Sequence, residues 1–228
     1  MIYSTQPKEK EKLFGYIYLF IDLFVLPLVL GTVNGMLPVQ LTSGQLNFVY
    51  YFINLAVILA VFRKFLFQSL KDALRAPFAN LWYGLLGYMG SNVLTRMLTV
   101  GLLLIFPSFA NINDQAVGQI LREDFALMAV GTILLVPIAE ETLFRGLIFR
   151  GLYDRSPIAA YLVSMAAFSA VHVMGYVGRV EPLMLVFSFI QYLPAGYCLC
   201  FAYRRSGTIL SPIVTHMIVN AMAVYAMR

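Results

Sequence analysis

The sequence predicts an all-α fold: a polytopic transmembrane helical bundle of about 7–8 helices around a buried polar cavity. Hydrophobic residues make up 61% of the 228 residues and charged residues only 12%, whereas soluble domains contain about 25% charged residues. The apolar residues fall in runs of roughly 20, the length that a helix needs to cross a bilayer. Acidic and histidine residues inside these runs indicate the cavity. No internal repeat or soluble region interrupts the pattern, so residues 1–228 are expected to form a single integral membrane domain.

The candidate spans follow one another along the whole chain. The first is longer than the apolar core of a signal peptide and lacks a small-residue cleavage motif, so it is expected to be retained. The third is long enough to be tilted, kinked or divided into two elements. The expected spans are residues 13–33, 46–67, 79–106, 125–150, 158–178, 183–203 and 208–227.

The basic residues alternate between the two sides of the predicted bundle. Lysines precede the first span, and basic residues follow the second, fourth and sixth spans. Because basic loops stay in the cytoplasm, the N-terminus is expected to be cytoplasmic and the C-terminus outside. The net charge of +5 is therefore assigned to these loops and not to nucleic-acid binding. Short loops and the lack of targeting signals favour a bacterial plasma membrane.

The fourth span carries charged residues that are costly in a membrane. A charge at the bilayer centre costs about 2.5–3.5 kcal/mol on insertion scales, so such residues are paired or face a cavity. Glu141 and Arg145 are spaced i, i+4, with the acid on the favourable N-terminal side, and are expected to form an ion pair. Glu140 points about 100° away around the helix and has no partner in its own segment. It is therefore available for chemistry or for a contact with another helix.

The two histidines of the chain, His172 and His216, both fall within predicted spans. Phe168 shares a helix face with His172, and Asn220 shares one with His216, because both pairs are spaced i, i+4. If the helices pack together, Glu140 and the polar groups of these two faces converge in one buried cavity. The structural alternatives are a hydrogen-bonded buried acid, a satisfied buried histidine and interhelical hydrogen bonds.

The motifs EETLFR, FSAVH and HMIVN, in this order, resemble those of the CPBP family. These CAAX-prenyl-protease and bacteriocin-processing membrane proteins are also called the Abi family. The resemblance covers about residues 125–225, which would form the catalytic core. It implies an intramembrane glutamic endopeptidase that requires neither a metal nor another cofactor.

The resemblance also implies roles for individual residues. Glu140 and His172 would activate a water molecule for attack on a peptide carbonyl, and His216 and Asn220 would hydrogen-bond the oxyanion. A positioned base is typically worth about 10²–10⁴-fold in rate, and an oxyanion donor about 10²–10³-fold. The residues that would support the site structurally are Glu141, Arg145 and Phe168.

The resemblance leaves the substrate open. It covers enzymes that trim prenylated C-terminal tripeptides and bacterial members linked to bacteriocin self-immunity or peptide-signal maturation. The expected partners are the lipid bilayer and a peptide or lipidated-peptide substrate, in a cavity that opens toward the cytoplasm. Nucleic acid is not expected.

Three other functions use the same residues. A glutamate and two histidines are legitimate zinc ligands, although the histidines lack the H-E-x-x-H spacing of a metalloprotease helix. A non-proteolytic immunity or signalling scaffold would hold a peptide without cutting it. A proton-coupled transporter would use the acid and the imidazoles as a relay, but the chain shows no inverted repeat.

Further polar and helix-breaking residues lie inside the spans. Arg96 and Asn92 are spaced i, i+4 and are expected to be structural. Arg96 would line the cavity or interact with Asp22, the acid of the first span. Pro137 frees the carbonyl of Ile133 and is expected to kink the fourth span just before the glutamates.

The cysteines of the chain, Cys198 and Cys200, lie two positions apart in the sixth span. At this spacing they face different sides of a helix. They are expected to be packing residues and not a disulfide or a metal site.

Overall fold

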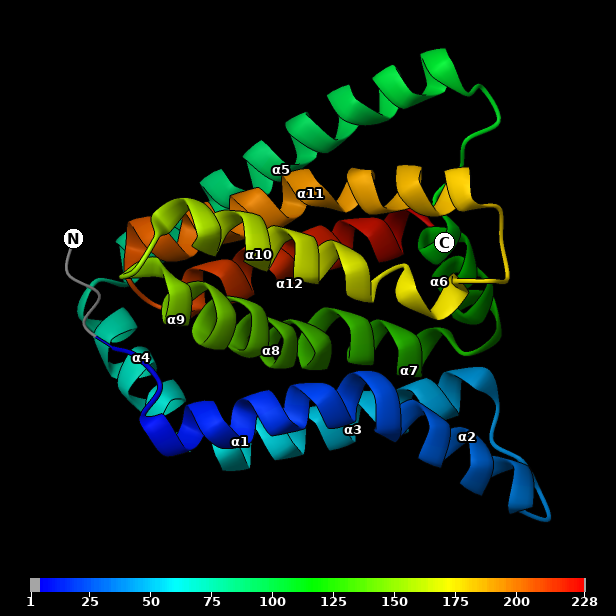
Figure 1. Ribbon diagram of the computed structural model, residues 1–228, viewed down its shortest axis with the longest axis horizontal. Coiled ribbons are helices and arrows are strands. Elements are labelled where there is room, and N and C mark those ends of the chain that lie inside the picture. Colours follow the sequence, from blue (N-terminus) through cyan, green and yellow to red (C-terminus); the bar gives the residue numbers. More distant parts are fainter. Residues whose placement is uncertain (1–4, 228) are drawn as a thin grey trace.

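The computed structural model describes residues 5–227, and this part of the chain is helical with no strand. Figure 1 shows the helices lying lengthwise in one bundle. The predicted all-α membrane fold is therefore confirmed. Within the described residues, five helical stretches are long and apolar enough to cross a membrane, and two apolar helices are shorter. These seven stretches correspond in order to the seven predicted spans.

Several spans are single helices. They are α3 (Ser43–Val61), α5 (Pro77–Ile105), α10 (Pro157–Val171), α11 (Pro182–Ser206) and α12 (Leu210–Ala226). The long third span, which could have been two elements, is thus the one uninterrupted helix α5. The fifth span is shorter than expected, because α10 ends just before His172 and the turn η4 (Met174–Tyr176) follows.

The first and fourth spans contain π-helical segments. The first consists of α1 (Glu9–Phe20), η1 (Ile21–Val25) and α2 (Leu26–Met36). The fourth consists of α7 (Phe125–Val130), η2 (Gly131–Leu135), α8 (Val136–Glu141), η3 (Thr142–Phe149) and α9 (Arg150–Tyr153). π-helical turns occur frequently at functional sites, and the fourth span combines two such segments with the adjacent glutamates.

Two helices were not expected from the sequence, α4 (Arg63–Arg75) and α6 (Ile112–Glu123). Both are amphipathic, and the few residues that they bury lie along one face. The predicted second span, 46–67, ran too far because the apolar residues 65–67 of α4 follow only two basic residues after the apolar run of α3. The Asn111 side chain accepts hydrogen bonds from the backbone N–H groups of Asn113 and Asp114, and so caps the N-terminus of α6.

The basic loops gather at one end of the bundle. The start of α1, helix α4, the α9–α10 connection and the α11–α12 connection all lie at the left of Figure 1. Helix α6 and the C-terminus lie at the opposite end. This arrangement agrees with the alternation of basic residues along the sequence.

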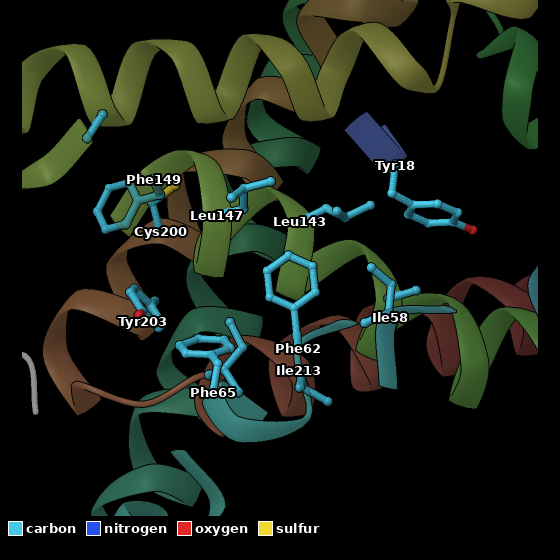
Figure 2. Close-up of a cluster of buried hydrophobic side chains, with 13 residues drawn as sticks. Tyr18, Ile58, Phe62, Phe65, Leu143, Leu147, Phe149, Cys200, Tyr203 and Ile213 are labelled. Carbon is cyan, nitrogen blue, oxygen red and sulfur yellow. The ribbon is translucent and has the colours of Figure 1, made fainter. Parts of the chain in front are cut away.

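Packing holds α5 against α11 and α12, and α10 against α11 and η3. In Figure 1, α5 leans away from α11 toward the end at Ile105. A core of buried side chains, shown in Figure 2, joins α1, α3, α4, η3, α11 and α12 near the basic end. Cys200 belongs to this core, and Cys198 is buried beside it; both are free thiols, which confirms their packing role.

Glycines let α5 and α12 approach closely. Thr215 Oγ1 donates a 2.8 Å hydrogen bond to the carbonyl oxygen of Gly84. A Cβ on Gly87 would lie 2.5 Å from the same Thr215 Oγ1. Small residues at a membrane helix interface permit this kind of backbone contact.

We expect Gly87→Ala to lower the stability of the protein by about 1–3 kcal/mol, because the added methyl group overpacks this interface. The matched control is Gly31→Ala, where an added Cβ meets nothing within 4 Å. Thermal unfolding in detergent, followed by a thiol-reactive dye that reports exposure of the buried cysteines, measures both. Equal transition temperatures for the two variants would contradict the close contact.

Candidate active site

A cavity of about 920 Å³ lies inside the bundle. Helices α3, α5, α6, α8, α11 and α12 contribute to its wall, together with the end of α10. The four residues predicted to converge all line it: Glu140, His172, His216 and Asn220. Three helices distant in sequence therefore bring these side chains to one space, as the i, i+4 spacings indicated.

The π-helical segment η2 sets the position of the first of these residues. The Val136 N–H bonds to the Gly131 carbonyl, one residue further back than in an α-helix. The disturbance expected at Pro137 thus takes the form of a wider turn and not of a break in the helix. Glu140 follows in α8, and its Oε2 atom is buried without a hydrogen-bond partner in the described part of the chain.

The neighbouring Glu141 is completely buried, and one of its carboxylate oxygens contacts two other side chains. Its Oε1 lies 3.0 Å from Arg145 Nη1 and 2.7 Å from His216 Nδ1. The ion pair expected between Glu141 and Arg145 is therefore present, and the contact with His216 adds a third member from α12. Arg145 also donates to the Gly196 carbonyl of α11, at 3.2 Å. This network joins three helices through charged groups that have no access to water.

The two predicted oxyanion donors already have one protein partner each. His216 uses Nδ1 for Glu141, which leaves Nε2 without a hydrogen bond to the described residues. Asn220 Nδ2 donates to the Thr132 carbonyl in η2, at 2.8 Å. An asparagine amide has a second N–H and an acceptor oxygen, so each side chain retains a group that can bind a ligand.

The protonation of His172 follows from its surroundings. Its Nδ1 lies 2.7 Å from the Phe168 carbonyl oxygen. Because a carbonyl only accepts, Nδ1 must carry the proton, and in the neutral ring Nε2 is then the acceptor. A general base needs such an acceptor. The ring lies between Phe168 and Tyr192, with centroid distances of 4.6 Å and 4.2 Å.

Tyr192 is a site residue that sequence reasoning missed. Its hydroxyl donates to Asp114 Oδ1 at 2.8 Å and accepts from Asn113 Nδ2 at 2.9 Å. Burial raises the pKa of the Asp114 carboxyl above its ordinary value, and the hydrogen bond from Tyr192 opposes that shift. Helix α6 thereby fixes the aromatic ring that stacks on His172.

Phe168 is surrounded by the functional groups of the site. Its ring lies 4.4 Å from the Arg145 guanidinium carbon and 5.6 Å from the His216 ring. It also contacts His172 and, edge to face, Phe144. Phe168 therefore forms an apolar wall that both imidazole rings share, which is compatible with the supporting role expected for it.

Asp22 has its own partners in α3. The Tyr50 hydroxyl donates to Asp22 Oδ1 at 2.8 Å, and Tyr18 donates to the neighbouring Asn54 at 2.6 Å. No ion pair joins Asp22 to Arg96 among the described residues. Arg96 instead lines the cavity from α5, which is one of the two placements considered from the sequence.

The residues of the site do not form a recognisable metal centre. Within residues 5–227, no group of three or more histidine, cysteine or acidic side chains is arranged to hold a metal ion. Both imidazole Nδ1 atoms are also engaged with protein oxygens. The donor set therefore offers two free Nε2 atoms and one free carboxylate oxygen from three different helices.

A membrane bundle with a buried Glu–His cavity is the class of protein that these observations define. Comparison with known proteins agrees with it. Residues 122–222 match the family of type II CAAX prenyl endopeptidase Rce1-like proteins. A Bacillus subtilis (strain 168) protein named "Putative membrane peptidase YdiL" is 30% identical over 113 residues, which is 49% of this chain and 41% of that protein. No solved structure matches the chain.

Through residues 122–222 the chain is thus similar to membrane proteases of the type II CAAX prenyl endopeptidase Rce1-like family, in agreement with the resemblance of its motifs to the CPBP family. The matched segment contains all the candidate site residues from Glu140 to Asn220. The chain spans about two-fifths of the length of the curated relative it matches.

We expect Arg145→Gln to be strongly destabilising, because removal of one partner from a buried ion pair costs about 3–5 kcal/mol. The control is Lys12→Gln, which removes a pair with Glu9, a residue whose side chain is 89% exposed. Such exposed pairs contribute at most about 1 kcal/mol. The yield of folded monomer and the thermal transition in detergent distinguish the variants. Similar values for both would show that Arg145 is dispensable to the fold.

Proposed function

We propose that this protein is an intramembrane endopeptidase in which Glu140 and His172 activate a water molecule. The single observation that carries the proposal is the meeting of a carboxylate oxygen without a partner and an imidazole with an acceptor Nε2 at one cavity. The match of residues 122–222 to a family of CAAX prenyl endopeptidases supports a peptide bond as the target. Residues 125–225 would form the catalytic core, and no cofactor is invoked.

In the proposed reaction, the water oxygen attacks the carbonyl carbon of the peptide bond. Glu140 takes one proton from the water, while His172 Nε2 accepts a hydrogen bond and orients it. The carbonyl oxygen becomes an oxyanion. His216 and Asn220 would hydrogen-bond it. Glu141 would stabilise the charged form of the His216 ring, in which Nε2 carries a proton.

Collapse of the tetrahedral intermediate completes the hydrolysis. The C–N bond breaks, and the proton held by Glu140 passes to the leaving nitrogen. The products are a carboxylic acid and an amine. Arg145 takes no part in these steps, because its charge is committed to Glu141 and to the Gly196 carbonyl. Its proposed contribution, with Phe168, is to hold His216 in place.

The proposed substrates are membrane-associated or secreted peptides, whether prenylated CAAX-type, bacteriocin-related or signal precursors. A cavity of about 920 Å³ is at the large end of the usual range of about 300–1,000 Å³ for ligand sites. It has room for several residues of an extended peptide. The apolar spans around it support a reaction within the bilayer.

We further propose that the N-terminus is cytoplasmic, in a bacterial plasma membrane, because the basic loops share one end of the bundle. The cavity-lining residues belong to the halves of the helices that lie away from that end. If the N-terminus is cytoplasmic, a cavity at this end of the bundle does not open to the cytoplasm, contrary to the expectation from the sequence. We propose that the cavity faces the outer half of the membrane.

We expect Glu140→Gln to reduce peptide cleavage by about 10²–10⁴-fold, because the amide cannot accept the proton of the water. Cleavage of a fluorescence-quenched farnesylated CAAX-type peptide by the purified protein in detergent measures this loss. A comparison of cellular peptides between wild type and Glu140→Gln covers other substrates.

The control for this experiment is Glu123→Gln, an exposed acid at the end of α6 whose loss should leave cleavage unchanged. Equal activity of Glu140→Gln and the wild type would overturn the proposed chemistry. Loss of activity with a strong chelator would favour the zinc-dependent alternative. A cellular phenotype that survives Glu140→Gln would favour a scaffold.

We expect a cysteine at Val39, in the α2–α3 connection, to react with a membrane-impermeant maleimide in intact cells. A cysteine at Arg155, in the α9–α10 connection, should react only after permeabilisation. Both positions are exposed, and the native Cys198 and Cys200 are first replaced by alanine. The reverse labelling pattern would place the cavity on the cytoplasmic side.

A further inference from the structure

Helix α5 presents a polar face to the cavity. Its polar residues recur at helical spacing, and those that line the cavity are Tyr88, Ser91, Asn92, Thr95 and Arg96. Thr99, one turn further on, accepts a 2.7 Å hydrogen bond from Gln191, which in turn accepts from Asn111. A membrane helix carries such a face only where it borders a cavity or another polar surface. The proposed chemistry uses none of these α5 residues.

Arg96 is the cation of this face. It is the one lysine or arginine among the described residues that line the cavity. Its side chain is exposed and makes no ion pair with any acid in residues 5–227. The aspartates among the described residues that line the cavity are engaged elsewhere, Asp22 with Tyr50 and Asp114 with Tyr192. A membrane-embedded guanidinium without a protein counter-ion is costly, and a bound anion removes that cost.

The position of Arg96 along the bundle sets the distance from the reaction centre. Gly87 contacts Thr215, the residue before His216, so these two helices are level there. Arg96 lies nine residues beyond Gly87, toward the end of the bundle away from the basic loops. At about 1.5 Å per residue this is an axial offset of about 13 Å. An extended peptide covers that distance in about four residues.

We propose that Arg96, with the Asn92 side chain one turn before it, binds the C-terminal carboxylate of the peptide substrate. The assignment rests on the proposed function, because it requires a peptide in the cavity. A carboxylate is held by a guanidinium through two parallel hydrogen bonds, and Asn92 supplies a further N–H. The offset places the bond to be cut only a few residues before the chain end. A lipid phosphate offers the same anionic chemistry, so the test separates the two sources.

The probe is a fluorescein-labelled farnesylated hexapeptide with a free C-terminal carboxylate, together with its C-terminal amide. Binding is measured by fluorescence polarisation in nanodiscs of phosphatidylcholine, with the Glu140→Gln protein so that no cleavage occurs. The free acid is expected to bind about tenfold more tightly than the amide, and Arg96→Gln is expected to abolish this difference. Arg96→Lys should retain part of it, and Arg122→Gln, which removes an exposed cation from α6, should retain all of it.

A preference for the free acid that persists in Arg96→Gln would overturn the assignment. So would a preference that disappears when anionic phosphatidylglycerol replaces zwitterionic phosphatidylcholine in the nanodiscs, because an anionic lipid headgroup would then occupy Arg96 in place of the peptide. Equal binding of acid and amide to the unmodified Arg96 protein would likewise reject it. Since binding is read without cleavage, a peptide that binds with carboxylate preference but is never cut would reject the proteolysis and retain the Arg96 site.

Discussion

The buried group formed by Glu141, Arg145 and His216 is the constraint on which the rest of the site depends. A lone charge in this position would be very costly, and the three groups pair with one another only when their helices are correctly placed. The 2.7 Å contact between Glu141 and His216 ties the fourth span to α12, and the bond from Arg145 to the Gly196 carbonyl ties it to α11. The same contacts orient His216 at the cavity. Stability and the arrangement of the polar groups are therefore determined by one network.

Two adjacent glutamates serve different purposes because a helix turns about 100° per residue. Glu141 points into the packed interior, where its charge is neutralised. Glu140 points to the cavity, where its Oε2 has no partner among the described residues. The π-helical segments on both sides of α8 adjust the register of these positions. They also leave the Thr132 carbonyl accessible to Asn220 from another helix.

The sequence was sufficient for the features that depend on local spacing. The apolar runs predicted the seven spans, and the i, i+4 rule predicted the Glu141–Arg145 pair. The position of His172 and His216 within predicted spans also led to the expectation that both face one cavity once the helices pack together. The amphipathic helices α4 and α6 were missed, because their charged residues resemble those of loops. The contact of His216 with Glu141 and the stack of Tyr192 on His172 could not be predicted from the sequence, because both depend on distances between helices.

The consecutive placement of the two glutamates restricts how the cavity can open. If the fourth span rotated to present Glu140 differently, Glu141 would be withdrawn from His216, and Arg145 would be withdrawn from the Gly196 carbonyl. That span must therefore act as the fixed frame of the molecule. Entry of a substrate has to be accommodated by other walls, and the far half of α5, which leans away from α11, is such a wall.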